Sequence, residues 1–253
     1  MSDLLVFTSI TEFRAYRAKL KGSVGVVLTM GALHAGHASL IVRSAGENDV
    51  TVVTIYVNPT QFDNPEDLKK YPRTWEADLA LAKKSGAQAV LAPSYEEIYP
   101  DQYRYKLTEN VFSTKLCGAH RPGHYDGVLT IVMKLFQITQ ADQSYFGEKD
   151  FQQLQLIKDM ANTFFLKTKV NACPTLRETS GLAMSSRNVR LTDAGKEKAP
   201  AIFQALTKSS TAVVAHKKLT DAGIEVEYLE EHFNRRFVAA FIDGVRLIDN
   251  VEI

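Results

Sequence analysis

The sequence has little of what marks a secreted, membrane-spanning or nucleic-acid-binding protein. Its 253 residues include two cysteines, Cys117 and Cys173, which are too few for a disulfide framework. No apolar run approaches the roughly 20 residues of a membrane-spanning helix. The 30 basic and 29 acidic residues give a net charge of +1, so no basic field indicates nucleic acid or an anionic membrane as a partner.

Residues 1–5 lack the charged start and the apolar core of a signal peptide, and we expect a cytoplasmic protein. The spacing of Cys117, His120 and His124 is one that zinc tolerates. However, no fourth ligand is evident, and residues 121–123 form a turn that places a cation among these side chains. We therefore favour a loop with chance histidines over a zinc site.

Strand-like apolar runs alternate with helical patterns through the first two-thirds of the chain. The runs predict strands at 24–28, 50–57, 89–92, 144–146 and 167–172, and helices at 37–47, 75–85, 127–138 and 150–163. This alternation predicts an α/β fold with a parallel sheet covered by helices. In such sheets, ligands bind beyond the carboxyl ends of the strands.

The pattern changes after Pro174. Residues 175–188 are polar and rich in turn formers, a long helix is predicted over 193–214, and strands are predicted over 226–229, 237–242 and 245–248. Asp243-Gly244 is a strong hairpin signal because both residues tolerate positive φ. We therefore expect two domains, with the parallel sheet in 1–175 and a smaller α+β domain in 176–253.

Four clusters of residues have the chemistry of a nucleotide site. In the first, a predicted strand leads into Gly31, His34, Gly36 and His37 at the start of a helix. Helix N-termini bind anions because their first N–H groups lack partners, and two imidazoles add donors for phosphate oxygens. The alternative is an ordinary strand–turn–helix corner with two solvated histidines.

Each of the other three clusters also has a structural alternative. Asn58 and Gln61 could bind a small polar substrate or belong to a proline turn. Within residues 146–153, Lys149 and Asp150 could meet phosphate and ribose, or Asp150 could cap the helix. Residues 181–188, with two hydroxyls and Arg187, suit a loop closing over a triphosphate, or an interdomain linker. No carboxylate cluster indicates a protein-held metal, so Mg²⁺ would arrive with the nucleotide.

These clusters belong to longer runs that together resemble the pantoate–β-alanine ligase (pantothenate synthetase) family. The runs follow the family's order over almost the whole chain: TMGALHAGH at 29–37, YVNPTQF at 56–62, RPGHYDGV at 121–128, FGEKDFQQ at 146–153, GLAMSSRN at 181–188 and RLIDN at 246–250. The resemblance implies a Rossmann-like doubly wound sheet, a smaller lid domain and a homodimer. It also implies ATP-dependent condensation of pantoate with β-alanine through a pantoyl adenylate, with Mg²⁺, releasing AMP and pyrophosphate.

The resemblance also implies roles for individual residues. His34 and His37 would contact the ATP phosphates, with His37 as proton donor. The catalytic set would be His34, His37, Lys149, Ser185 and Arg187. The ATP-binding set would be Met30, Gly31, Gly36, His37, Gly147, Lys149, Asp150, Leu176, Met184, Ser185, Ser186 and Arg187, and the pantoate and β-alanine set would be Met30, Asn58, Gln61 and Gln153.

Three positions depart from the family pattern: Leu28 stands where proline is frequent, Ala35 where glutamate is frequent and Ser180 where aspartate is frequent. The C-terminal domain is also shorter than usual between residues 214 and 237, which bears on lid closure and dimer contacts.

Two other functions are alternatives. One is an HxGH nucleotidyltransferase that acts on a phosphorylated substrate, which would need an additional phosphate-binding group. The other is a nucleotide-binding module without catalysis, which the intact His34, His37, Lys149 and Arg187 disfavour.

Overall fold

The computed structural model describes residues 3–253, and their contacts divide the chain into two compact units. The first unit comprises residues up to Gly147 together with 152–173, and the second comprises 148–151 together with 174–253. In this described part of the chain, no helix is long and apolar enough to cross a membrane.

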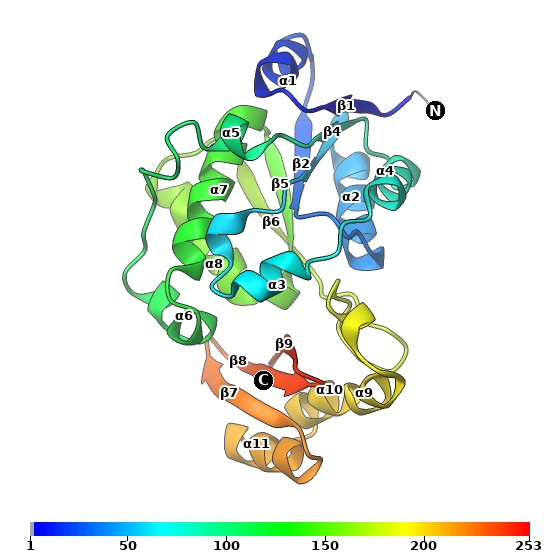
Figure 1. Ribbon diagram of the computed structural model, residues 1–253, viewed down its shortest axis with the longest axis vertical. Coiled ribbons are helices and arrows are strands. Elements are labelled where there is room, and N and C mark those ends of the chain that lie inside the picture. Colours follow the sequence, from blue (N-terminus) through cyan, green and yellow to red (C-terminus); the bar gives the residue numbers. More distant parts are fainter. Residues whose placement is uncertain (1–2) are drawn as a thin grey trace. The chain divides into compact units, whose positions relative to one another are not determined.

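Among the described residues, six parallel strands form the sheet of the first unit (Figure 1). The chain runs outward from β2 through β3 to β4 and then returns to the other side of β2, where it forms β5. The strand order therefore reverses between β2 and β5, which is the switch point where doubly wound sheets bind ligands. This confirms the predicted α/β class. In sheet order the strands are β1 (Leu5–Phe7), β4 (Ala89–Leu91), β3 (Val50–Ile55), β2 (Val24–Thr29), β5 (Gln143–Gly147) and β6 (Lys169–Cys173).

Helices cover both faces of this sheet, which explains why its central strands are apolar along nearly their whole length. On one face, Leu40 and Ile41 pack with Ala82 against the valines of the strands. Helices α7 and α8 lie on the opposite side of the sheet from α2 and α4 (Figure 1). The helices are α1 (Ile10–Arg17), α2 (Ala35–Glu47), α3 (Pro65–Lys69), α4 (Trp75–Lys84), α5 (Tyr95–Ile98), α6 (Cys117–His120), α7 (His124–Thr139) and α8 (Phe151–Thr163).

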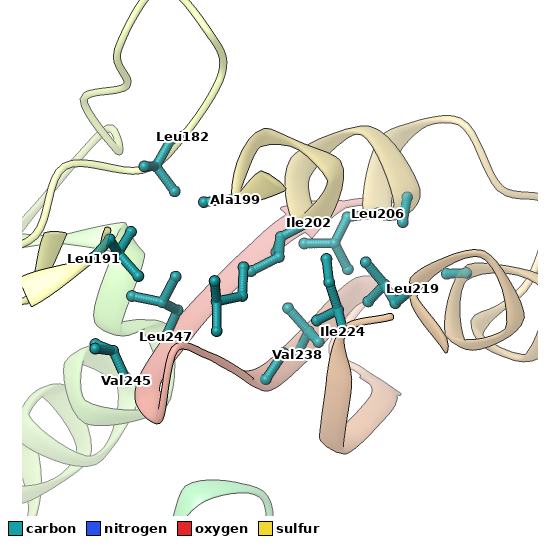
Figure 2. Packing of buried hydrophobic residues seen from close by; sticks show 14 of the residues in the cluster. Leu182, Leu191, Ala199, Ile202, Leu206, Leu219, Ile224, Val238, Val245 and Leu247 are labelled. Carbon is teal, nitrogen blue, oxygen red and sulfur yellow. The ribbon is translucent and has the colours of Figure 1, made fainter. Parts of the chain in front are cut away.

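The second unit has its own apolar core, between helices and an antiparallel sheet. Strands β7 (Glu225–His232), β8 (Arg235–Ile242) and β9 (Val245–Glu252) pair in that order. Ile202, Leu206 and Leu219 from the helices pack with Val238 and Leu247 from the strands (Figure 2). The hairpin predicted at 243–244 is confirmed, since its two residues have φ values of +53° and +69°.

The single long helix predicted over 193–214 is wrong. The structure divides this region into α9 (Asp193–Lys198), α10 (Pro200–Thr207) and the start of α11 (Ala212–Asp221). Pro200 begins α10 because proline has no N–H to continue the preceding helix, and the Thr211 hydroxyl caps α11. The apolar pattern also fails to indicate α1 and β1, and β1 is a three-residue edge strand that is too short to show a period.

A buried arginine satisfies the end of α10. Arg236 is 2% exposed and donates from Nη1 to the carbonyls of Leu206 and Ser209, at 2.8 Å each. Its Nη2 pairs with Glu231 at 2.8 Å. The last carbonyls of a helix have no partner within the helix, so Arg236 supplies donors that the backbone lacks.

Replacing Arg236 with Met is expected to lower the free energy of unfolding by about 3 kcal/mol, because buried carbonyls lose their donor. Urea unfolding followed by circular dichroism measures the change. Lys217→Met, which removes an exposed pair with Asp221, is the control and should cost under about 0.5 kcal/mol. Equal stability of the two variants would contradict the role of Arg236.

Candidate active site

One buried carboxylate holds the loop between β2 and α2. Asp78 of α4 is 2% exposed, and it accepts the backbone N–H groups of Ala32 and Leu33 at 2.9 and 2.7 Å. The loop turns through positive φ at Gly31 (+80°) and Ala32 (+50°). A Cβ at Gly31 would lie 2.9 Å from Asp78 Oδ2, so glycine both permits the turn and leaves room for the carboxylate.

His34 and His37 form a capping box at the start of α2. The Nδ1 atom of His34 accepts the N–H of Gly36 at 3.1 Å, and Nδ1 of His37 accepts the N–H of His34 at 3.3 Å. In the usual capping box, the side chain of an N-cap Ser or Thr and that of a Glu three residues later accept these backbone N–H groups. Here His34 and His37 are the two acceptors, which explains their three-residue spacing. Because each Nδ1 accepts, a neutral ring carries its proton on Nε2.

The corner after β2 can therefore donate hydrogen bonds to an anion. The two imidazole rings lie close together, with centroids 4.1 Å apart. They stand at a helix N-terminus, where the backbone dipoles already favour negative charge. This is the arrangement that stabilises charge on a phosphate group.

The carboxamide of Asn58 is buried and fully engaged. It is 1% exposed, and its Oδ1 accepts the hydroxyls of Tyr99 at 2.9 Å and Thr60 at 3.0 Å. Its Nδ2 donates to the Gly127 carbonyl at 3.2 Å and to Gln61 Oε1 at 3.1 Å. Two hydroxyl donors on Oδ1 fix the orientation of this amide.

The orientation of Asn58 in turn fixes that of Gln61. Since Gln61 Oε1 accepts from Asn58, its Nε2 turns the other way, toward Met30 Sδ at 3.2 Å. Gln61 lies on the 3₁₀ turn η1 (Pro59–Gln61) after β3, and it presents an N–H donor there. Desolvation raises the pKa of Tyr99 to about 12, so its phenol remains a donor across the neutral range.

The motif at residues 121–128 supports the backbone of Gln61. The carbonyl of Gln61 accepts from His124 Nδ1 at 2.7 Å and from Arg121 at 3.3 Å. A Cβ at Gly127 would lie 2.4 Å from the Thr60 carbonyl oxygen, so only glycine lets α7 approach η1 this closely. In the part of the chain that the structure describes, no group of three His, Cys, Asp or Glu residues could hold a metal.

Neighbouring glutamines of α8 have different surroundings. Gln152 is buried, and its side chain bonds to the Tyr125 hydroxyl and to backbone groups of Phe112, Lys115 and Cys117. Gln153 is half-buried, and its side chain makes no hydrogen bond to another of residues 3–253. Gln152 thus secures the segment around α6, whereas Gln153 has an amide that a ligand could use.

Several predicted residues belong to the second unit. Lys149 and Asp150 lie on η3 (Glu148–Asp150), with Lys149 Nζ 3.8 Å from Asp150 Oδ2. Gly147, which precedes them at the end of β5, has open space where a Cβ would stand.

The loop after Pro174 folds back on itself. The N–H of Met184 donates to the Leu176 carbonyl at 3.0 Å, which brings these two predicted residues together. The hydroxyl of Ser185 accepts the N–H of Arg187 at 3.2 Å. At the departure position, the Ser180 hydroxyl accepts the N–H of Leu182 at 3.4 Å and supports the turn.

The structure thus groups the predicted residues into two sets. Asp78 and Tyr99, which position members of the first set, were missed because no short motif links them to distant partners. The first unit contains Met30, Gly31, His34, Gly36, His37, Asn58, Gln61, Gly147 and Gln153, and the second contains Lys149, Asp150, Leu176, Met184, Ser185, Ser186 and Arg187.

The sheet and its HxGH corner place the chain in the doubly wound α/β class. A family model described as pantoate-beta-alanine ligase matches residues 5–252. Pantothenate synthetase from Bdellovibrio bacteriovorus is 54% identical over 98% of this chain and 99% of its own length. Pantothenate synthetase from Legionella pneumophila strain Lens is 47% identical over 97% of this chain and 98% of its own length.

Solved structures agree with these relatives. Pantoate-beta-alanine ligase from Francisella tularensis, complexed with beta-gamma ATP and beta-alanine, has a TM-score of 0.95 and 40% identity, covering 99% of this chain and 98% of that one. Pantothenate synthetase from Thermus thermophilus has a TM-score of 0.90 and 35% identity, with coverage of 98% and 99%. The chain belongs to the pantoate–β-alanine ligase family and is an enzyme.

Replacing Tyr99 with Phe is expected to lower the free energy of unfolding by about 1 kcal/mol near neutral pH, because Asn58 loses one donor. The native pKa of about 12 lies above the ordinary value of 10.0. The wild-type advantage should therefore be constant below pH 10 and decline as pH rises toward 12. Urea unfolding at several pH values measures it, and a decline already complete by pH 10 would contradict the assigned environment.

Proposed function

We propose that this enzyme joins pantoate to β-alanine in two steps and consumes ATP. In the first step the pantoate carboxylate attacks the α-phosphorus of ATP, forming pantoyl adenylate as pyrophosphate leaves. In the second step the β-alanine amine attacks the pantoyl carbonyl, an amide forms and AMP leaves. The observation that carries this proposal is the HxGH corner, where two Nδ1-anchored imidazoles stand at a helix N-terminus at the switch point of the sheet.

The charged and donor groups suit the phosphate side of this reaction. We assign His34 and His37 to the ATP phosphates, where Nε2–H donors stabilise the negative charge that passes to pyrophosphate. His37 is the proposed proton donor. Lys149 and Arg187 add fixed positive charge, and the Ser185 hydroxyl adds a donor.

The other ATP assignments concern the nucleoside and the approach of the backbone. Asp150 accepts from ribose hydroxyls in this proposal, and the glycines allow close approach of ATP. The residues assigned to these contacts are Met30, Gly31, Gly36, Gly147, Asp150, Leu176, Met184 and Ser186.

Neutral amides suit pantoate, a small hydroxy acid. We assign Gln61 and Gln153 to its oxygens, with Gln61 Nε2 as donor, and Met30 to the wall of the same pocket. Asn58 acts through Gln61, because all of its own donors and acceptors are engaged within the protein. β-Alanine then uses the same amides. A phosphorylated substrate would require cations in this position, which the Asn58–Gln61 network does not supply.

We propose that Mg²⁺ enters with ATP, held by the phosphates and water, because the residues assigned to the phosphates are cations and hydroxyl donors rather than carboxylates. The ion neutralises phosphate charge when it is bound. We further propose a cytoplasmic homodimer in which residues 1–175 bind both substrates and residues 176–253 act as a lid.

The test of this function is ATP–pyrophosphate exchange by the purified protein with Mg²⁺. We expect exchange that requires pantoate, followed by AMP release when β-alanine is added. Exchange without pantoate, or with a phosphorylated acceptor in its place, would favour the nucleotidyltransferase alternative. No exchange by folded protein that binds ATP would favour a module without catalysis.

Replacing His37 or Lys149 with Ala is expected to lower turnover by about two orders of magnitude or more, because the phosphate loses a positioned donor or cation. Steady-state rates and circular dichroism together separate lost chemistry from lost fold. His216→Ala, at an exposed position of α11, is the matched control and should be unchanged. Near-normal turnover of both site variants would overturn the assignment.

A further inference from the structure

A buried asparagine of β9 bonds to the backbone of the turn that carries Lys149. Asn250 is 2% exposed, and its Nδ2 donates to the carbonyls of Glu148 and Lys149 at 2.9 and 3.0 Å. Its Oδ1 accepts from Arg235 Nε at 2.8 Å. With an arginine donor on its oxygen, the amide can present only its NH₂ group to the turn.

Arg235 belongs to the same clamp. Its guanidinium lies over the Phe151 ring at 4.4 Å, and its Nη2 is 3.9 Å from Glu148 Oε2. The turn at 148–151 is therefore bonded at its backbone by Asn250 and flanked at both ends by Arg235. These contacts explain why Glu148–Phe151 groups with the second unit, although β5 and most of α8 belong to the first.

The preceding residue of β9 holds a different segment. Asp249 is 6% exposed and accepts both terminal nitrogens of Arg177, at 2.6 and 2.9 Å. Arg177 also donates to the Gly181 carbonyl at 3.1 Å and stacks on Phe203 at 4.0 Å. Successive residues of a strand point to opposite faces, so two neighbours can hold two separate segments.

We propose that Asn250 and Asp249 are positioning residues for ATP, resting on the function proposed above. Asn250 sets the backbone from which Lys149 and Asp150 project. Asp249, through Arg177, sets the base of the loop that continues into Ser185 and Arg187. One short run of β9 thereby preorganises both groups of ATP contacts that the second unit supplies. Neither residue touches ATP in this proposal.

The test combines hydrogen exchange with steady-state kinetics on the full-length protein. We expect Asn250→Ala to speed amide exchange in residues 148–152 and to raise the KM for ATP by roughly tenfold, because the turn must be ordered on binding. The KM for pantoate should change by less than about twofold. Asn250→Asp should behave alike, since its carboxylate retains the Arg235 contact but cannot donate to the two carbonyls.

Asn171→Ala is the matched control. Asn171 is also a buried strand asparagine that donates to a backbone carbonyl, that of Ser144 in the first unit. The Asn171→Ala variant should leave unchanged both the amide exchange of residues 148–152 and the ratio of the KM for ATP to the KM for pantoate. Asp249→Asn should speed exchange in residues 176–184 rather than in 148–152, because it weakens the bond to Arg177.

Amide exchange of residues 148–152 at the wild-type rate in both Asn250 variants would contradict the proposed role of Asn250. So would equal rises in both KM values, since that pattern reports general destabilisation. If Asn250→Ala does not fold, Arg235→Met tests the same clamp with a smaller expected rise in exchange. The exchange measurement needs no turnover, so failure of the wild type to form pantothenate would overturn the proposed function alone.

Discussion

The candidate site depends on one buried carboxylate that holds two backbone N–H groups. Asp78 stabilises the Gly31–Leu33 loop in a conformation with two consecutive positive φ values, one of them at alanine. That turn brings His34 into the N-cap position of α2 with extended backbone angles. The capping box then anchors both imidazoles by Nδ1. The direction in which the histidines donate thus follows from the backbone of the corner.

The two units supply different chemistry. In the first, a relay of hydrogen bonds from Tyr99 through Asn58 to Gln61 gives a neutral amide a defined polarity. In the second, β9 holds the segments that carry Lys149 and Arg187, which are cations. Neutral amides are suited to a small hydroxy acid and cations to phosphates, so this division is consistent with the proposed activation of pantoate by ATP.

Local sequence patterns predict most of the secondary structure of this enzyme, but they do not reveal the hydrogen bonds between residues that are far apart in the sequence. Strands β2 to β9, the 243–244 hairpin and the HxGH corner follow from periodicity and turn chemistry within short windows. Asp78 lies 46 residues from Ala32, and Asn250 lies 102 residues from Glu148, so no local window contains both partners. The prediction of one helix over 193–214 is wrong because Pro200 begins a new helix and Thr211 caps the next one, and apolar spacing carries neither signal. The role of His124, whose Nδ1 donates to the Gln61 carbonyl, likewise depends on a partner 63 residues away.

The anchoring of both imidazoles by Nδ1 is tested most directly by the tautomeric state of the two histidines, measured by ¹⁵N NMR of the imidazole nitrogens near pH 8. His34→Gln and His37→Gln variants would assign the signals. We expect both rings to carry their proton on Nε2, with Nδ1 unprotonated, and Asp78→Ala to disturb this state. A proton on Nδ1 of either ring would contradict the capping box, and with it the proposed basis for phosphate recognition.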